Sequence, residues 1–126
     1  SICYEVAFGP EQLVFLPAAG LLVNVSNDAW FGDSIAPHQH LRMARMRALE
    51  AGRHMLRATN TGITALITPH GNVQATIPQF KPGVLTGVVR PHTGITPYVR
   101  TGNWPVVAAT LLILVLVAGI GRRHRR

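Results

Sequence analysis

The residue best suited to covalent chemistry is Cys3, the only cysteine among 126 residues. A thiolate is a strong nucleophile, and nearby backbone N–H groups stabilise it. Residues 1–4 read as the end of a strand, and Pro10 predicts a helix start shortly afterwards. We therefore expect the Cys3 sulfur at the edge of a sheet, next to Tyr4 and close to Glu5. The alternative is an inert thiol in the core, the commoner role of a lone cysteine.

Other residues with chemical potential lie on a loop over residues 26–36, which is rich in Asn, Asp, Ser and Gly. Asn27 is a candidate for substrate binding. Trp30 and Phe31 either line an apolar pocket or cap the core. Asp28 lies between these residues.

The histidine pair His38 and His40 has the spacing H-x-H. A metal site needs a third ligand, and none can be placed from the sequence. A single cysteine also excludes a zinc site built from several thiolates. We expect neither a metal nor a cofactor.

Charge is unevenly distributed along the chain. There are 12 basic and 5 acidic residues, for a net charge of +7. Nine of the basic residues fall into two groups, a predicted helix and the extreme C-terminus: Arg42, Arg45, Arg47, Arg53, Arg57, Arg122, Arg123, Arg125 and Arg126. Aromatic residues interleave with neither group, so a platform for stacking bases is missing and we expect no nucleic-acid binding.

The elements that must position these residues follow from periodicity and turn signals. Alternating strands and helices predict an α/β fold with a helix packed closely on a sheet, because the apolar face of the second helix carries mainly alanine. In chain order we expect a helix over 10–18, a strand over 21–25, a helix over 37–58, a turn over 59–62, a hairpin of strands 63–67 and 73–77, a strand over 84–89 and a linker over 90–103.

The C-terminal segment predicts a transmembrane helix over residues 104–121. Residues 106–121 carry no charge, Trp104 suits a membrane interface, and the basic tail 122–126 favours the cytoplasm. Residues 1–103 then form a domain on the outer side of that membrane. The alternative is a buried core helix, because the apolar run is short.

Three segments together resemble one family. They are ICYEVAFG at 2–9, LVNVSNDAWFG at 22–32, and QHLRMARMRALEAGRHMLRATNTG at 39–62. The first is similar to the nucleophile segment of the nitrilase, or carbon–nitrogen hydrolase, superfamily. All three, with the segment at 83–104 and the final helix, resemble its membrane-anchored apolipoprotein N-acyltransferase branch.

The resemblance implies the C-terminal part of a nitrilase-like α-β-β-α sandwich, followed by one transmembrane helix. It implies a Glu-Lys-Cys catalytic set in which Cys3 is the nucleophile. The glutamate and the lysine of that set precede the cysteine in the family, so we expect this chain to be an inactive fragment that lacks both. Tyr4 and Glu5 match the family's residues after the cysteine, and Glu5 either orients groups around the thiol or caps a helix start. Arg47 and Glu50 match an Arg-x-x-Glu pair, expected to be a structural ion pair.

The implied reaction is acyl transfer at a bacterial inner membrane, with the catalytic domain on the periplasmic side. A fatty acyl group moves from a membrane phospholipid to Cys3 as a thioester, and then to the N-terminal amine of the S-diacylglyceryl cysteine of an apolipoprotein. Two alternatives stay open. One is a soluble nitrilase-type hydrolase, such as an amidase. The other is a non-catalytic, membrane-anchored fragment in which Cys3 only fills the core.

Overall fold

The computed structural model describes residues 1–16 and 18–123. Its centre is a four-stranded sheet in the order β1-β2-β3-β4, built from β1 (Leu22–Ser26), β2 (Met55–Thr59), β3 (Thr64–Ile67) and β4 (Val73–Ile77). Strands β1 and β2 are parallel, and the other two pairs are antiparallel. The mixed α/β fold class predicted from the sequence is confirmed, and so are the strand near 21–25 and the 63–77 hairpin.

The start of the chain extends the sheet beyond β1. Ile2 forms a parallel bridge with Val25, and the Ser1 carbonyl accepts a hydrogen bond from the Val25 N–H at 3.2 Å. The 3₁₀ helix η1 (Cys3–Ala7) begins at the next residue. The expected end of a strand at residues 1–4 is therefore present as a short bridge, and the chain turns sharply at Cys3.

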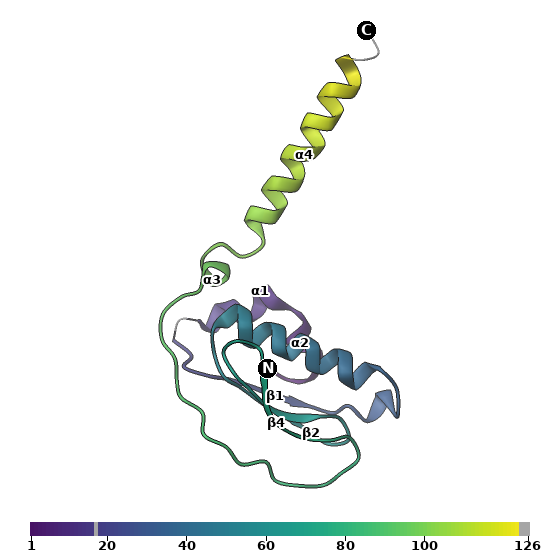
Figure 1. The fold of residues 1–126 in the computed structure, drawn as a ribbon, viewed down its shortest axis with the longest axis vertical. Helices are drawn as coiled ribbons and strands as arrows, with labels where there is room; N and C mark the ends of the chain where they lie inside the picture. Colours follow the sequence, from purple (N-terminus) through teal and green to yellow (C-terminus); the bar gives the residue numbers. More distant parts are fainter. Residues whose placement is uncertain (17, 124–126) are drawn as a thin grey trace.

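Helices cover one face of the sheet (Figure 1). Helix α2 (Ala36–Ala51) connects β1 to β2, as a parallel pair requires. Its alanines Ala44, Ala48 and Ala51 are at most 3% exposed, so the predicted close packing is confirmed. These alanines form the core together with residues of η1, β1, β2 and β3 and with Leu16, which precedes β1. The core residues are Val6, Leu16, Leu22, Ala44, Ala48, Ala51, Met55, Ala65 and Ile67.

The prediction of one helix over 37–58 is wrong in its last third. Helix α2 stops at Gly52, which adopts a left-handed conformation with φ of 61° and donates its N–H to the Ala48 and Leu49 carbonyls. Glycine reaches this conformation without steric cost, so it ends the helix. Residues 55–59 then form β2, which the sequence analysis counted as the last turn of the helix.

Two other elements differ from their predictions. The helix expected over 10–18 is a short α1 (Gly9–Gln12) followed by the 3₁₀ helix η2 (Leu13–Phe15), and Pro17 lies outside the described residues. The strand expected over 84–89 is wrong, because this segment has no regular structure. It crosses the outer face of the sheet close to Leu66 without joining the ladder (Figure 1). Valine-rich composition favours extended backbone, but a strand also needs a pairing partner.

Residues 90–103 return the chain to the helical side and contain the short helix α3 (Pro97–Thr101). Arg53 holds this segment in place. Its guanidinium donates to the carbonyls of Ala19 and Gly94, both at 2.8 Å, and it is 2% exposed. The sequence analysis placed this arginine within a helix over 37–58, and that placement is wrong because α2 ends at Ala51.

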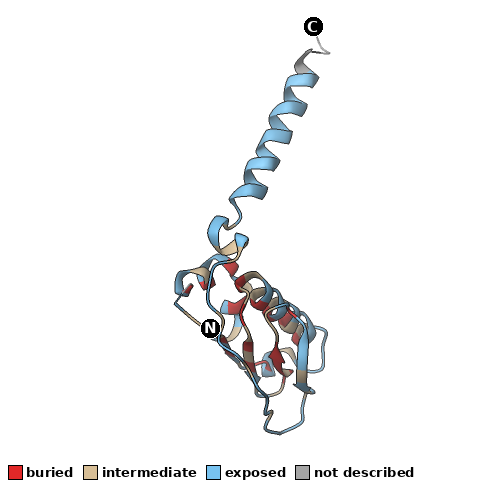
Figure 2. Ribbon diagram, turned by 60° about the vertical axis from the view of Figure 1, so that its left-hand side comes forward, coloured by how far each residue is buried: buried red, intermediate tan, exposed pale blue. Residues whose placement is uncertain are grey.

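Helix α4 (Trp104–Arg123) projects away from the sheet, and Figures 1 and 2 show it separate and exposed. It is the one helix within residues 1–16 and 18–123 that is long and apolar enough to cross a membrane, over Trp104–Gly121. None of that stretch is buried, so the alternative of a buried core helix does not fit. The positions of residues 124–126 in the basic tail lie outside the described residues.

Candidate active site

Cys3 occupies a sharp turn between the parallel bridge at Ile2 and helix η1. Its φ is 49°, a left-handed conformation that costs a residue with a side chain roughly 1–2 kcal/mol. The thiol is half-buried and does not belong to the apolar core. The Ser26 hydroxyl donates to the sulfur at 3.6 Å. The core-residue alternative therefore does not match this polar, partly open position.

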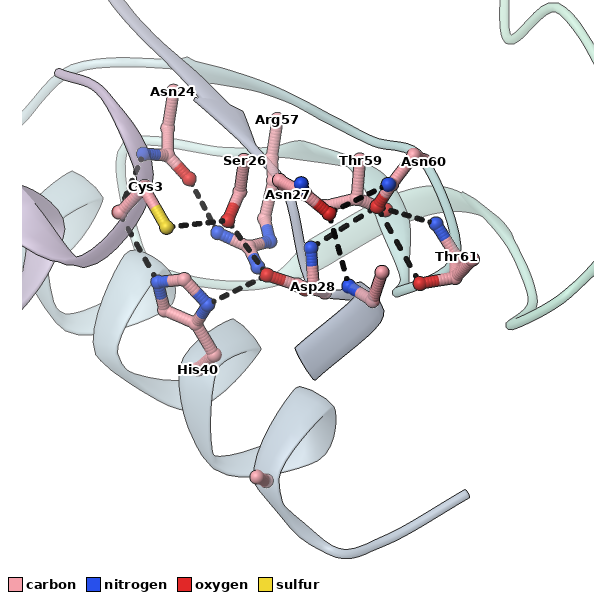
Figure 3. A network of polar contacts seen from close by, with 12 residues as sticks. Cys3, Asn24, Ser26, Asn27, Asp28, His40, Arg57, Thr59, Asn60 and Thr61 are labelled. Carbon is pink, nitrogen blue, oxygen red and sulfur yellow. Dashed lines mark hydrogen bonds and ion pairs between the residues drawn. The ribbon is translucent and has the colours of Figure 1, made fainter. Parts of the chain in front are cut away.

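Behind Cys3 lie buried side chains that carry charge (Figure 3). Asp28 is 1% exposed, and its carboxylate accepts from the guanidinium of Arg57 at 2.9 Å. The other Asp28 oxygen lies 3.0 Å from Nδ1 of His40 and accepts from the Ser26 hydroxyl at 2.6 Å. Charges buried this deeply are stable only when they are paired and hydrogen-bonded, and Asp28 meets both conditions.

Asn24 and His40 connect this group to the Cys3 backbone. The Asn24 amide donates to the Cys3 carbonyl at 3.3 Å, and Nε2 of His40 lies 3.2 Å from the same oxygen. The side-chain carbonyl of Asn24 accepts from Arg57, its cross-strand neighbour. Both nitrogens of His40 therefore have partners other than the sulfur, so His40 is not placed to act as a general base for the thiol.

Burial lowers the pKa of the Arg57 guanidinium from its ordinary value. Two anions act in the opposite direction, the Asp28 carboxylate and the Cys3 thiolate. Arg57 is therefore a source of positive charge behind the sulfur, held inside the fold by Asp28.

The loop after β1 is braced by a pair of asparagines. Oδ1 of Asn27 accepts from the Asn60 amide at 2.7 Å and from the Ala29 N–H at 3.1 Å. Oδ1 of Asn60 accepts from the Asp28 N–H at 3.0 Å. Asn27, expected as a substrate-binding residue, thus holds the loop that places Asp28, and its contact with substrate stays a prediction.

The predicted aromatic residues surround the site unevenly. The rings of Tyr4 and Phe31 flank His40, with centroid distances of 5.9 and 6.1 Å. Trp30 is 85% exposed. For Trp30, capping of the core therefore does not fit, and the pocket-lining alternative stays open.

The structure shows the contacts of two carboxylates that the sequence analysis singled out, Glu5 and Glu50. Glu5 accepts the backbone N–H of Ile2 at 2.7 Å, the helix-start contact that was its alternative role. Glu50 forms an ion pair with Arg47 at 2.9 Å, as predicted. Burial raises the pKa of Glu50, and Arg47 partly opposes that rise.

Sequence reasoning missed the importance of His40, Arg57 and Asn24. His40 was considered only as a metal ligand, and Arg57 only as one of the basic residues of a predicted helix. The available signal was polarity within apolar alternation, since Asn24 and Arg57 lie at buried-face positions of β1 and β2. A polar side chain at such a position needs a buried partner, and these two are partners of each other.

Within residues 1–16 and 18–123, no cluster of three or more His, Cys, Asp or Glu side chains could hold a metal ion. A hollow of about 380 Å³ lies on the opposite face of the sheet, among side chains that include Val23, Leu56 and Val84. Cys3 does not line it, so it is not the pocket of the thiol.

Comparison with known proteins gives one family. The family model described as carbon–nitrogen hydrolase matches residues 1–96. Proteins named apolipoprotein N-acyltransferase are similar over most of this chain: 58% identical over 124 residues in Methylococcus capsulatus, 53% over 129 in Ralstonia nicotianae and 54% over 114 in Azotobacter vinelandii. These alignments cover 98, 99 and 90% of this chain, and 25, 24 and 22% of the relatives. The chain spans about a quarter of the length of the curated relatives it matches.

Proposed function

The chain belongs to the carbon–nitrogen hydrolase family, and from that premise we propose that it carries the nucleophile of an acyltransferase that N-acylates lipoproteins. The observation that carries the proposal is the position of Cys3. Its sulfur stands at a sharp turn, partly open to solvent, with the buried charge of Arg57 behind it. The names of the relatives, apolipoprotein N-acyltransferase, supply the reaction class.

The proposed reaction has two acyl transfers. The Cys3 thiolate attacks the carbonyl of a phospholipid ester, the ester C–O bond breaks, and a lysophospholipid leaves with a proton. The acyl group is then held as a thioester. The free amine of an S-diacylglyceryl cysteine attacks that thioester, the C–S bond breaks, and the product is an amide.

The other side chains near Cys3 have proposed roles in this scheme. The backbone N–H of Tyr4 donates to the tetrahedral oxyanion. Exposed Trp30, with Phe31 and Asn27, contacts the acyl chain or the headgroup, since an exposed indole at a lipid-facing site needs no other partner. The base and a lysine that also stabilises the oxyanion come from upstream of Cys3, as the family resemblance implies.

The membrane position of the reaction is part of the proposal. Helix α4 spans the bacterial inner membrane with Trp104 at the outer interface, the domain on the periplasmic side and the C-terminus in the cytoplasm. Phospholipid and lipid-modified protein are both membrane-bound, so a domain held at the surface meets both substrates. A C-terminal reporter that is active only in the cytoplasm tests this orientation, and activity of a periplasmic reporter instead would reverse it.

Cys3→Ala and Cys3→Ser variants of the complete protein test the chemistry. With a phospholipid radiolabelled in its acyl chain, the unsubstituted protein should acquire label that hydroxylamine releases, as expected for a thioester. Cys3→Ala should acquire none, and Cys3→Ser should form at most an ester that resists mild hydroxylamine. Thioester label on Cys3→Ala would remove Cys3 from the mechanism.

Addition of a diacylglyceryl-cysteine peptide then identifies the acceptor. Transfer of the label to the peptide amine supports the acyltransferase. If the label appears only as free fatty acid, water is the acceptor and the protein is a hydrolase of the same family.

A further inference from the structure

Five groups close a polar ring that begins and ends at the nucleophile. The Cys3 carbonyl accepts from His40, His40 contacts Asp28, Asp28 pairs with Arg57, Arg57 donates to Asn24, and Asn24 donates back to the Cys3 carbonyl. The four side chains are at most 2% exposed. We call this arrangement the polar ring, and Figure 3 shows its side chains around Cys3.

The partners of His40 define its hydrogen-bonding role. The Cys3 carbonyl can only accept a hydrogen bond, so Nε2 of His40 is the donor in that contact, and Nδ1 lies 3.0 Å from an Asp28 oxygen. Arg57 and Ser26 also donate to the Asp28 side chain. The charged and titratable groups that face His40 are Asp28 on one side and Cys3 with Tyr4 on the other.

The Cys3 carbonyl is the only backbone group of the polar ring, and it belongs to the sharp turn at the nucleophile. A trans peptide is planar, and its C=O and N–H point in opposite directions. Two donors that hold the Cys3 carbonyl inward therefore direct the Tyr4 N–H outward, away from the polar ring. They also stabilise the left-handed conformation of Cys3, which is unfavourable without such support.

We propose that His40 is a positioning residue that, together with Asn24, grips the Cys3 carbonyl and so aims the Tyr4 N–H at the oxyanion formed during acyl transfer. The identity of the physiological substrate in this inference rests on the proposed function. The contacts of His40 and Asn24 with the Cys3 carbonyl do not depend on it. A donor that is needed only in the transition state changes kcat and leaves KM nearly unchanged. Removal of an oxyanion donor costs about 10²–10³ in kcat, and misdirection costs part of that.

Two substitutions of His40 separate its two contacts. The amide nitrogen of Gln reaches the position of Nε2, so His40→Gln keeps a donor for the Cys3 carbonyl. The amide nitrogen of Asn reaches the position of Nδ1, so His40→Asn keeps only the contact with Asp28. His38→Gln is the matched control, because His38 lies on the same helix, is exposed, and its imidazole contacts the Gln79 side chain rather than any member of the polar ring.

The test is made in the complete protein with a nitrophenyl ester, whose release burst reports acylation of a thiol without any phospholipid. We expect His40→Asn to lower the acylation kcat by roughly 10-fold or more with KM within about twofold. His40→Gln should retain most of the rate, and His38→Gln all of it. Equal rates in His40→Asn and the unsubstituted protein would overturn the proposal, as would equal losses in the Gln and Asn variants.

A second variant and a second reaction guard against misfolding. Asn24→Asp keeps an acceptor for Arg57 but removes the donor to the Cys3 carbonyl, so it should reproduce the His40→Asn effect. Alkylation of Cys3 by iodoacetamide forms no oxyanion, so it should stay within about threefold in every variant. If alkylation slows as much as acylation in both variants, the polar ring only maintains the fold and the proposal is wrong.

These readouts are separable from the proposed function. A protein that acylates with the nitrophenyl ester but never with phospholipid would reject the lipid substrate, and the comparison of Gln with Asn at position 40 would still decide the role of His40.

Discussion

The polar ring and helix α4 depart from the usual burial pattern in opposite ways. In the polar ring, two opposite charges and two further polar side chains are almost wholly enclosed. In α4, eighteen consecutive residues of high hydropathy are unburied. A buried polar group must find its partners inside the protein, whereas an exposed apolar helix must find them outside it. The polar groups of the first region are therefore satisfied by contacts within the protein. The apolar side chains of α4 need an apolar environment outside the described domain, and lipid is the environment that we propose.

The comparison also separates two kinds of sequence signal. The apolar run of α4 is contiguous, so its length alone predicts a membrane span. The members of the polar ring come from η1, β1, the loop after it, α2 and β2. No local pattern contains all of them, because they become neighbours only when β1 and β2 pair. The ring is a product of tertiary structure, and its variants should affect folding and chemistry together.

The largest effect is expected for Arg57→Leu. It leaves the Asp28 carboxylate buried without its strongest partner, and breaking a buried pair from one side costs about 3–5 kcal/mol. The thermal unfolding midpoint of the detergent-solubilised protein should fall sharply. Arg42→Leu, the same change at an exposed position of α2, should alter stability by less than about 0.5 kcal/mol. Similar midpoints for the two variants would mean that the Asp28–Arg57 pair contributes little to stability.

The corresponding test of α4 places a charge where the comparison expects lipid. Leu114→Arg puts a guanidinium near the middle of the helix, where insertion costs about 3 kcal/mol. Modification of flanking acceptor sites measures the ratio of inserted to non-inserted helix. This equilibrium constant should fall by roughly 100-fold. Leu114→Ala is the control and should still insert. Normal insertion of the arginine variant would favour a protein partner for α4 rather than lipid.

How much the sequence predicts depends on whether its signals are local. The apolar face of α2 was predictable because Ala44, Ala48 and Ala51 recur at helical spacing, and the 63–77 hairpin because two apolar runs flank a turn. Cys3 was found as a candidate because it is the only thiol, with support from its family resemblance. The residues beneath it were not, because a strand position for Arg57 becomes visible only once Gly52 is recognised as the end of α2.

A smaller effect is expected for Gly62→Ala. A Cβ atom at this position would lie 2.1 Å from Oδ2 of Asp28 and 2.8 Å from its Cβ, so Asp28 would have to move away from Arg57. We expect a loss of about 1–3 kcal/mol, in the range of overpacked cores. Thermal unfolding and the nitrophenyl ester burst should both report it.

Gly83→Ala is the matched control for this change. The nearest atom to its Cβ would be the flexible end of Ile77 at 3.2 Å, which can move aside. If Gly62→Ala were as stable and as active as Gly83→Ala, the placement of Asp28 would not be critical, and the polar ring would tolerate more disorder than its burial implies.

The smallest expected effect concerns the Arg47–Glu50 pair on α2, which is partly exposed and therefore intermediate between the two regions. Burial raises the Glu50 pKa above its ordinary 4.5, so the protonated form is favoured in the folded state. The contribution of protonated Glu50 to the free energy of unfolding is fully present below about pH 4.5. It is lost as the pH rises through the raised pKa of Glu50 in the folded protein. Glutamine does not titrate, so Glu50→Gln should not show this loss. The thermal unfolding midpoint of Glu50→Gln minus that of the unsubstituted protein should therefore increase between pH 4 and pH 7.5.

The size of the gain should stay below about 1 kcal/mol, because Arg47 offsets part of the burial cost and solvent screens the pair. A midpoint for Glu50→Gln that falls relative to the unsubstituted protein as pH rises would mean that attraction to Arg47 exceeds the cost of burial. The pair would then resemble the fully partnered charges of the polar ring rather than a tolerated surface contact.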